Sequence, residues 1–411
     1  MKKKLRIGIL FGGRSGEHEV SLLSAASILR AIDRKRYEVV PIAIDKQGRW
    51  LSGEESQRQI DGPASALRSA TSEAEIEFAT AAAVLRSGEP LQIPSPHPMR
   101  RATDLLERST GAELAQPGNL LAASLDVVFP VLHGTFGEDG TIQGLFELAD
   151  IAYVGSGVLG SSAAMDKDAM KRLFAAAGLP QTPHVALLRS QWRTDPKRVV
   201  RLIEKSLRYP LFVKPANLGS SVGISKVHAR SELAAAIDLA ATFDRKLIVE
   251  QGVGGPGVKP REFEVAVLGN CEPQASVVGE IVPNKEFYDY DSKYADSPED
   301  PSIPIIPAKL TASESKQIRE MALAAFRACD CSGLARVDFL MEPARDAKGR
   351  KIKKPRIFLS EINTMPGFTS ISMYPKLWQV SGIPYRKLID RLIALALERH
   401  REKQQTRFTL S

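Results

Sequence analysis

The feature that most constrains the fold is an alternation of strand-like and helix-like segments near the N-terminus. Leu5–Phe11 is an apolar run that ends at a glycine pair, and Ser21–Ile32 has helical spacing. Tyr37–Ile44 is again apolar and rich in β-branched residues. This alternation predicts a parallel sheet with crossover helices, to which the apolar run Leu125–Leu132 adds a further buried strand.

The 411 residues are enough for two or three domains. Residues 53–122 are polar, alanine-rich and contain a proline cluster, so we interpret them as an insertion with one or two helices, one of them around Ala74–Arg86. A helix is predicted over Ser162–Ala177, before Gly178 and Pro180. The remaining elements that we expect are strands at Tyr209–Lys214, Ile224–Val227, Lys246–Glu250, Glu262–Leu268, Ala275–Val282, Gly333–Met341 and Arg356–Ile362, and helices at Ser231–Ala241 and Ala312–Ala328.

Composition excludes several classes of protein. Hydrophobic residues make up 43% and charged residues 25% of the chain, as in ordinary globular proteins. No apolar run approaches the roughly 18 residues of a membrane span. The three cysteines fit neither a disulfide framework nor a CxxC metal site, and they favour a reducing, cytoplasmic location.

The net charge of +8 is concentrated locally. The segment from Arg345 to Arg356 is strongly basic, and we interpret it as a solvated loop between two strands. No aromatic or recognition pattern accompanies it, so we expect no nucleic-acid partner. Positive charge still favours an anionic substrate such as a nucleotide.

One glycine motif is a weak signal. Gly155, Gly157 and Gly160 match GxGxxG, but no acidic residue ends a strand about 20 residues later, where a dinucleotide site needs one. A tight strand-to-helix turn is the preferred interpretation. A dinucleotide-dependent oxidoreductase remains the alternative from another class.

The segment Val213–Gly223 is more informative. Lys214 ends an apolar strand, and a Gly/Ser loop leads into the next strand. Glycines let backbone N–H groups approach phosphate oxygens while the lysine adds positive charge, so this segment can cover a nucleotide. A plain glycine-rich hairpin is the alternative.

Two strands near the C-terminus carry paired polar residues. Arg336 and Asp338 are two residues apart, as are Glu361 and Asn363, so each pair faces one side of its strand. If the strands are neighbours, Asp338, Glu361 and Asn363 form an oxygen cluster suited to Mg²⁺ on ATP phosphates. Arg336 can then neutralise a transition state, and a surface salt bridge is the alternative.

Several single residues are further candidates for the functional site, and most of them also have an ordinary structural explanation. Glu19 opens a helix and can hold a substrate ammonium or merely cap the helix. His133 ends a buried strand, where parallel sheets place ligands. The N–H of Gly367 can serve an oxyanion, and Ser372 is by default a helix-start residue. The aromatic, charged loop from Phe287 to Tyr294 is typical of a lid or of a surface Ω-loop.

These motifs together resemble the D-alanine–D-alanine ligases, a family of ATP-grasp enzymes in peptidoglycan precursor synthesis. The resemblance spans nearly the whole chain. It rests on the ordered segments Phe11–Ser21, His133–Gly144, Met165–Lys167, Lys214–Gly223, Tyr288–Tyr294 and Glu361–Pro375.

The resemblance implies an α/β chain that is α+β in its ATP-grasp part. It implies a Rossmann-like N-terminal domain over 1–157, a central ATP-grasp subdomain over 158–252 and a C-terminal catalytic domain over 253–411. It implies ATP and two Mg²⁺ (or Mn²⁺) as cofactors, D-alanine and ATP as small-molecule partners, and a cytoplasmic homodimer without nucleic-acid or membrane partners.

The resemblance also assigns roles to single residues. It implies that Asp338, Glu361 and Asn363 hold the metals, and that Arg336 and Gly367 stabilise the tetrahedral intermediate. The residues implied for ATP are Lys167, Lys214, Ser221, Glu250, Glu262 and Tyr288. Those implied for the two D-alanines are Glu19, Ser220 and Tyr294 as a hydrogen-bonded triad, with His133, Lys293, Ser372 and Met373.

The implied reaction passes through a D-alanyl phosphate, from which the Tyr288–Tyr294 lid keeps water away. Tyr294 favours D-alanine as the nucleophile, because relatives that make the D-lactate depsipeptide lack tyrosine there. Two alternatives stay open: a D-alanine–D-serine or D-alanine–D-lactate ligase, and a non-catalytic nucleotide-binding relative.

Overall fold

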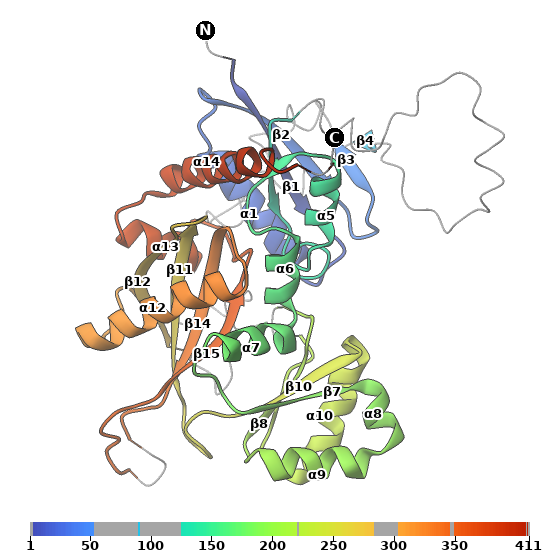
Figure 1. Cartoon of the computed structure of the whole chain (residues 1–411), viewed down its shortest axis with the longest axis vertical. Helices are drawn as coiled ribbons and strands as arrows, with labels where there is room; N and C mark the ends of the chain where they lie inside the picture. Colours follow the sequence, from blue (N-terminus) through green and yellow to red (C-terminus); the bar gives the residue numbers. More distant parts are fainter. Residues whose placement is uncertain are drawn as a thin grey trace, which may run out of the picture.

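The computed structural model describes residues 3–52, 89–90, 125–219, 222–282, 303–345, 349–407 and 409. Within these ranges the chain forms a mixed α/β structure with three separate sheets (Figure 1). The predicted helix around Ala74–Arg86 and the predicted lid lie outside the described residues. None of the helices in the described part of the chain is both long and apolar enough to cross a membrane.

The first sheet has the order β4-β3-β2-β1-β5-β6, and its central strands are parallel as predicted. The predicted strand Tyr37–Ile44 has the observed bounds, and the other two start or end within two residues of their predicted limits. The strands are β1 (Leu5–Gly12), β2 (Tyr37–Ile44), β3 (Trp50–Ser52), β4 (Glu89–Pro90), β5 (Val127–Val131) and β6 (Ala152–Tyr153), and the helices α1 (His18–Ala31) and α5 (Thr141–Leu148) accompany them.

The single helix that we predicted over Ser162–Ala177 is wrong. The chain instead forms α6 (Val158–Met165) and α7 (Lys167–Ala176), separated by Asp166 in an extended conformation. The Asp166 carboxylate accepts the backbone N–H groups of Asp168 and Ala169 and so caps a new helix. As a result α7 begins next to the second sheet, with a lysine in its first turn.

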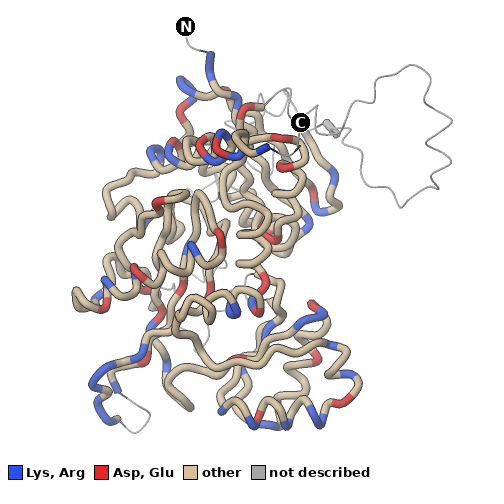
Figure 2. The backbone as a smooth tube through the Cα atoms, viewed as in Figure 1, with Lys and Arg blue, Asp and Glu red and all other residues tan. Residues whose placement is uncertain are grey.

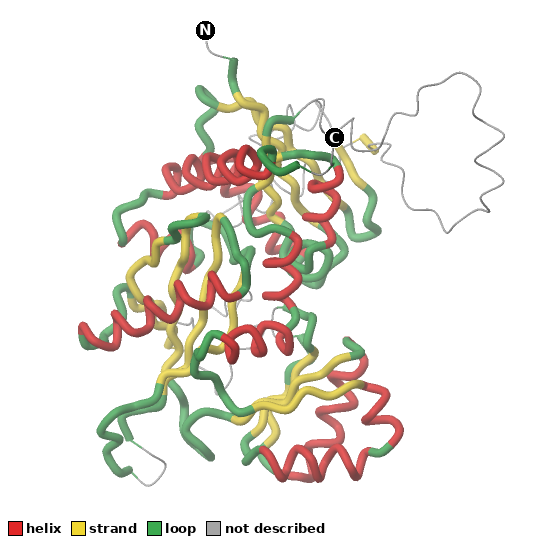
Figure 3. The backbone as a smooth tube through the Cα atoms, viewed as in Figure 1, coloured by secondary structure: helices red, strands yellow, loops and turns green. Residues whose placement is uncertain are grey.

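The second sheet is antiparallel in the order β7-β10-β8-β9. Its buried side chains form a core of their own with the helices that pack on it, which are visible in Figure 3. The sequence patterns did not predict β7, α8 or α9. The elements are β7 (His184–Leu188), α8 (Arg189–Thr194), α9 (Pro196–Ser206), β8 (Leu211–Pro215), β9 (Ser225–Val227), α10 (Arg230–Phe243) and β10 (Lys246–Gln251).

The third sheet is antiparallel in the order β13-β12-β11-β14-β15. The last helix, α14, lies against the first sheet (Figure 1), and one core cluster includes residues of both. The elements are β11 (Arg261–Gly269), β12 (Gln274–Val282), β13 (Ile303–Ile305), α12 (Ala312–Ala328), β14 (Gly333–Met341), β15 (Ile357–Asn363), α13 (Met373–Val380) and α14 (Tyr385–Lys403).

The GxGxxG glycines allow the chain near β6 and α6 to pack closely against the start of β14. They form the predicted strand-to-helix turn, between β6 and α6. Gly155 has a φ of +105°, and its backbone lies 3.1 Å from the position that a Cβ on Gly333 would take. A Cβ on Gly160 would lie 2.5 Å from the carbonyl oxygen of Asp330. These glycines therefore let the first and third sheets approach each other closely.

The basic segment between β14 and β15 is a loop, as predicted. Figure 2 shows the Lys and Arg positions of this segment gathered at one end of the molecule. Its described lysines and Arg350 are exposed, and Arg356 pairs with Glu342 at 2.6 Å.

Candidate active site

Lys214, Glu250 and Lys171 form a group that we call the lysine cluster. Neighbouring antiparallel strands, β8 and β10, carry Lys214 and Glu250, and the Lys214 Nζ lies 3.2 Å from the Glu250 Oε2. Lys171, from α7, is fully buried and places its Nζ 3.5 Å from the Glu250 Oε1. One carboxylate is thus held between two ammonium groups, which leaves one net positive charge.

The pKa values in the lysine cluster reflect this arrangement. Burial would raise the pKa of Glu250, but Lys171 and Lys214 lower it to about 2. Burial would lower the pKa of Lys214, but Glu250, Glu361 and Glu262 raise it. Glu250 and Lys214 therefore stay charged at neutral pH, and the lysine cluster lies within electrostatic reach of Glu361 on β15.

Lys167 is in the first turn of α7, and its Nζ donates to the carbonyl oxygen of Leu218 at 2.7 Å. This contact joins α7 to the Gly/Ser loop that follows β8. The loop continues through Ser220 and Ser221, which lie outside the described residues. The predicted phosphate-binding segment and Lys167 are therefore brought together at the start of that loop.

Arg336, Asp338, Glu361, Asn363 and Glu264 form a second group, the acidic cluster. The register pairs Arg336 with Asn363 and Asp338 with Glu361, so the predicted neighbourhood of the two strands is confirmed. Arg336 donates its Nε and Nη2 to the two Asp338 oxygens at 2.8 and 2.7 Å. Asn363 donates its Nδ2 to the Asp338 Oδ2 at 3.0 Å.

Glu264 is a member of the acidic cluster that sequence reasoning missed. It faces Asp338 across β11 and β14, and its Oε2 lies 3.3 Å from the Arg336 Nε. Its spacing of two residues from Glu262 was the available signal, because alternate strand residues share a face. Burial would lower the pKa of Arg336, but Asp338, Glu264 and Glu361 hold it well above its ordinary value.

His133 follows β5 and is buried. Its Nε2 lies 3.1 Å from the Ser24 Oγ, and its Nδ1 lies 2.9 Å from the carbonyl oxygen of Met365, two residues beyond Asn363. Burial lowers the pKa of His133 against the opposing effect of Glu17. The imidazole is therefore neutral at neutral pH and joins the first sheet to the end of β15.

The structure does not bring Glu19 to the other predicted residues. Its carboxylate pairs with Lys46, and its side chain is 44% exposed. Glu17, one half-turn earlier, is only 8% exposed. A Cβ on Gly134 or on Gly219 would come within 2.6 or 2.5 Å of the Glu17 Oε2, so Glu17 lies against both loops. The geometry therefore favours Glu17 over Glu19.

Glu138 lies beside Glu17 and was also missed. Its Oε1 accepts the backbone N–H of Gly134 at 2.9 Å. Burial and the neighbouring Glu17 raise the pKa of Glu138 to about 8. Two carboxyl groups this close repel each other when both are ionised, so the pair is suited to a cationic group such as an ammonium.

The turn after β15 brings Gly367 and Ser372 together. A Cβ on Gly367 would lie 3.2 Å from the Ser372 Oγ, which accepts the Thr369 N–H at 3.1 Å. The side chain of Met373 points to Gly279 of β12 and packs against the core. Tyr288, Lys293 and Tyr294 lie outside the described residues.

The described ranges hold no group of three His, Cys, Asp or Glu side chains that can bind a metal ion. Within the acidic cluster, Asp338, Glu361 and Asn363 instead present two carboxylates and one amide on the paired strands β14 and β15. Mg²⁺ typically takes one or two carboxylates and completes its shell with water and phosphate oxygens. These residues therefore fit a metal that arrives with a phosphate ligand.

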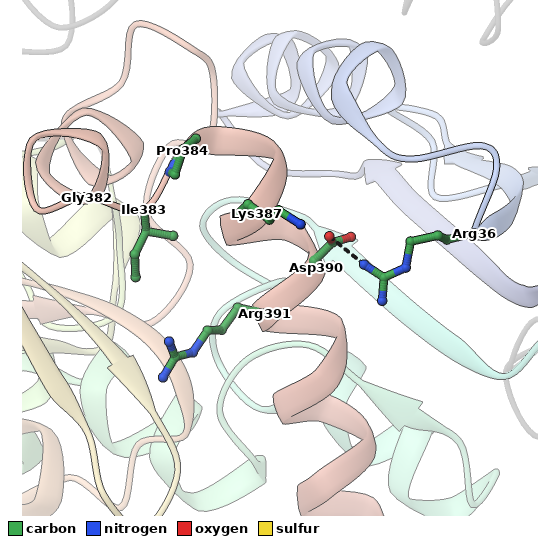
Figure 4. Close-up of a pocket in the computed structure, with 7 residues that line it drawn as sticks. All are labelled: Arg36, Gly382, Ile383, Pro384, Lys387, Asp390 and Arg391. Atoms are coloured by element: carbon green, nitrogen blue, oxygen red, sulfur yellow. Dashed lines mark hydrogen bonds and ion pairs between the residues drawn. The ribbon is translucent and has the colours of Figure 1, made fainter.

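One surface hollow among the described residues lies away from both clusters. It measures about 390 Å³ and lies at the start of α14, where Arg36 pairs with Asp390 at 2.6 Å (Figure 4). None of the predicted site residues lines it.

Two antiparallel sheets that bring together a lysine cluster and an acidic cluster, beside a sheet with parallel central strands, are consistent with the ATP-grasp class of ligases. Sequence comparison is more specific. The model of the D-ala D-ala ligase N-terminus matches residues 6–156, and that of the D-ala D-ala ligase C-terminus matches residues 173–394. The chain belongs to the D-alanine–D-alanine ligase family.

Relatives and solved structures agree with this. The chain is 46% identical to the D-alanine--D-alanine ligase of Geobacillus kaustophilus over 99% of this chain and 98% of the relative. It is 48% identical to that of Heliobacterium modesticaldum, over 98% and 97%. The structure of the D-alanine-D-alanine ligase from Coxiella burnetii matches with a TM-score of 0.70 and 33% identity, over 98% of this chain and 96% of that one.

A second solved structure is the VanG D-Ala:D-Ser ligase from Enterococcus faecalis. It matches with a TM-score of 0.72 and 32% identity, over 96% of this chain and 100% of that one. Membership of the family therefore does not by itself identify the second substrate.

Proposed function

We propose that this protein joins two D-alanine molecules into D-alanyl-D-alanine for peptidoglycan precursor synthesis, converting ATP to ADP and phosphate. The observation that carries the proposal is the pairing of Arg336 and Asp338 with Asn363 and Glu361 on adjacent strands. This cluster lies within electrostatic reach of the lysine cluster. Relatives at 46% and 48% identity over nearly the whole chain carry the name of this activity.

In the first step, the carboxylate of one D-alanine attacks the γ-phosphorus of ATP. The bond from this phosphorus to the bridging oxygen breaks, ADP leaves, and D-alanyl phosphate forms. We assign the phosphates to Lys167 and Lys214 with Ser221, and the adenine and ribose to Glu250, Glu262 and Tyr288. The net positive charge of the lysine cluster supports this assignment.

We assign two Mg²⁺ ions, or Mn²⁺, to Asp338, Glu361 and Asn363. When bound, they would neutralise charge on the transferring phosphoryl group. Hard oxygen ligands on paired strands support the assignment.

In the second step, the amine of the other D-alanine attacks the acyl carbon. The tetrahedral intermediate collapses, the bond between the acyl carbon and the phosphate oxygen breaks, phosphate leaves with that electron pair, and the amine loses a proton. We assign the oxyanion to Arg336 and the Gly367 N–H. Arg336 holds Asp338 with two hydrogen bonds and also contacts Glu264. Glu264 can therefore keep Arg336 in place when Asp338 turns to a metal.

We assign the ammonium of the first D-alanine to Glu17, in place of Glu19, together with Ser220 and Tyr294. The burial of Glu17 against Gly219, the residue before Ser220, supports this choice. His133 lies near the first substrate, and Lys293 and Ser372 orient the second. The packing of Met373 against β12 does not support a substrate contact for it.

We further propose a Rossmann-like domain over 1–157, an ATP-grasp subdomain over 158–252 and a catalytic domain over 253–411. The separation of the three sheets along the chain supports this division. A homodimer and a cytoplasmic location are proposals from the family resemblance alone.

The test is mass spectrometry of the products from purified protein, Mg-ATP and D-alanine, with D-serine, D-lactate and L-alanine as competitors. We expect D-alanyl-D-alanine and one ADP per dipeptide. A mixed dipeptide or depsipeptide as the main product would keep the reaction and overturn the choice of nucleophile. No product and no ADP would contradict the proposal.

A further inference from the structure

Lys171 is a charged residue that the proposed mechanism does not use. It lies on α7 and is fully buried, although its neighbours along the helix, Met170 and Phe174, already supply apolar packing. Among the described residues, its Nζ makes no hydrogen bond, and its ion pair with Glu250 is 3.5 Å long. A buried ammonium with so few partners is costly, so its position calls for a reason.

The charges around Glu250 supply that reason. The Glu250 carboxylate offers Oε1 to Lys171 and Oε2 to Lys214, and Thr182 donates to the same Oε2 at 3.5 Å. Lys214 is 15% exposed at its side chain, whereas Lys171 is at 0%. Only Lys214 can therefore turn toward a ligand while Lys171 stays in place.

We propose that Lys171 is a positioning residue for nucleotide binding. From its buried position Lys171 neutralises the Glu250 carboxylate, so that Lys214 can leave Glu250 and bind the nucleotide phosphates. Without Lys171, the remaining Lys214 and Glu250 would form a closed pair with no net charge. Nucleotide binding would then have to break this pair and strand a buried carboxylate. Burial lowers the pKa of Lys171 against the opposing effect of Glu250, so the proposal rests on the ion-pair geometry of the lysine cluster.

This inference rests on the proposed assignment of nucleotide phosphates to Lys214. The experiment measures ADP binding directly, by calorimetry with Mg²⁺, so it does not depend on product formation. If wild-type protein binds no ADP, the proposed function fails. If wild-type protein binds ADP and the Lys171 variants bind it equally well, only this inference fails.

The first variant is Lys171→Met, which keeps the length of the side chain and removes the charge. We expect ADP affinity to fall by about tenfold or more, because an ion pair must now be broken. The KM for ATP should rise in parallel, while the KM for D-alanine and kcat change by less than about threefold. A general structural defect would instead lower kcat and raise both KM values.

Arg172→Met is the matched control. Arg172 is the next residue of α7, is 74% exposed and pairs with Asp168 rather than with Glu250. We expect wild-type ADP affinity. Lys171→Gln, which removes the charge but keeps a hydrogen-bond donor, is the second variant if Lys171→Met does not fold, and the same loss is expected.

The double variant that combines Glu250→Gln with Lys171→Met gives the decisive measurement. Glu250→Gln should weaken ADP binding by itself, because Glu250 is also assigned to the adenine and ribose. In this background Lys214 has lost the carboxylate with which it pairs, so adding Lys171→Met should change the remaining ADP affinity by less than about twofold. Equal losses from Lys171→Met in both backgrounds would overturn the proposal, as would wild-type affinity in a folded Lys171→Met protein.

Discussion

The lysine cluster and the acidic cluster are built on opposite charge balances. In the lysine cluster two ammonium groups surround one carboxylate. In the acidic cluster one guanidinium faces three carboxylates, those of Asp338, Glu264 and Glu361. Opposite charges offset only part of the charge in each cluster: two positive charges and one negative charge leave +1 in the lysine cluster, and one positive and three negative charges leave −2 in the acidic cluster. The charge that remains is positive in one cluster and negative in the other, as phosphate and a divalent metal respectively require.

The two clusters are also built on different strands. Glu361 contributes to the pKa values of Lys171, Lys214 and Arg336, so the clusters influence each other. They nevertheless lie on different sheets, β8 and β10 in one case and β11, β14 and β15 in the other. A ligand with phosphates and metal ions therefore has to bridge two sheets.

The largest effect is expected for Glu361→Gln, which removes one negative charge from the acidic cluster. Metal ligation by carboxylate contributes several kcal/mol, so D-alanine-dependent ADP release should fall by about 10³-fold or more. Glu342→Gln is the control, because Glu342 also pairs with an arginine, Arg356, but lies outside the cluster. Full activity in Glu361→Gln would refute its assignment as a metal ligand.

Arg336→Lys keeps the charge of the acidic cluster but loses the planar fork that binds both Asp338 oxygens. We expect kcat to fall by about 10²- to 10³-fold, the usual cost of losing an oxyanion donor. Steady-state kinetics with saturating ATP and D-alanine measure this. A kcat within threefold of wild type would mean that charge alone suffices and that the fork has no role.

Glu17→Gln and Glu19→Gln distinguish the buried from the exposed carboxylate at the start of α1. Losing a charged hydrogen-bond partner costs about 1.5–3 kcal/mol, so Glu17→Gln should raise the KM for D-alanine by about 10- to 100-fold. Glu19 pairs with Lys46 on the surface, and such pairs contribute about 0–1 kcal/mol, so its loss should change the KM by less than about twofold. The reverse order of effects would restore Glu19 to the site.

The smallest effect concerns stability in acid. Glu250 has its pKa lowered from 4.5 to about 2 and faces Lys171, Lys214 and His184. A lowered pKa contributes stability that is present above pH 4.5 and is lost as pH falls toward 2. Between pH 5 and pH 3 the free energy of unfolding of wild type should therefore fall by about 1–2 kcal/mol more than that of Glu250→Gln. Urea unfolding at both pH values measures this, and equal losses would show that Glu250 is not held ionised by the lysines.

Much of the fold could be predicted because its strands are strongly patterned. The parallel strands β1, β2 and β5 are continuous apolar runs, and the polar pairs on β14 and β15 follow the two-residue period of a strand. Local sequence patterns were less informative where a single side chain determines where one helix ends and the next begins. Asp166 divides one helical pattern into two helices through a cap that only its hydrogen bonds reveal.

The site was harder to predict where burial depends on packing. Glu17 and Glu19 are both acids at the start of one helix, and only the contacts of α1 decide which one is buried. Sequence alone predicts that Lys171 lies at the surface, because a lysine side chain is almost never fully buried without a partner. Its partner, Glu250, lies 79 residues further along the chain, and no local spacing connects them.

The most direct test of this account is the dependence of ADP affinity on Mg²⁺, measured by calorimetry with and without the metal in wild type, Lys214→Met and Glu361→Gln. Binding of metal and nucleotide is reciprocal, so a metal held by the acidic cluster must raise ADP affinity. We predict that Mg²⁺ strengthens ADP binding in wild type. Lys214→Met should bind ADP weakly but keep this Mg²⁺ effect, whereas Glu361→Gln should lose it. A Glu361→Gln protein with the full Mg²⁺ effect would contradict the division of phosphate and metal between the two clusters.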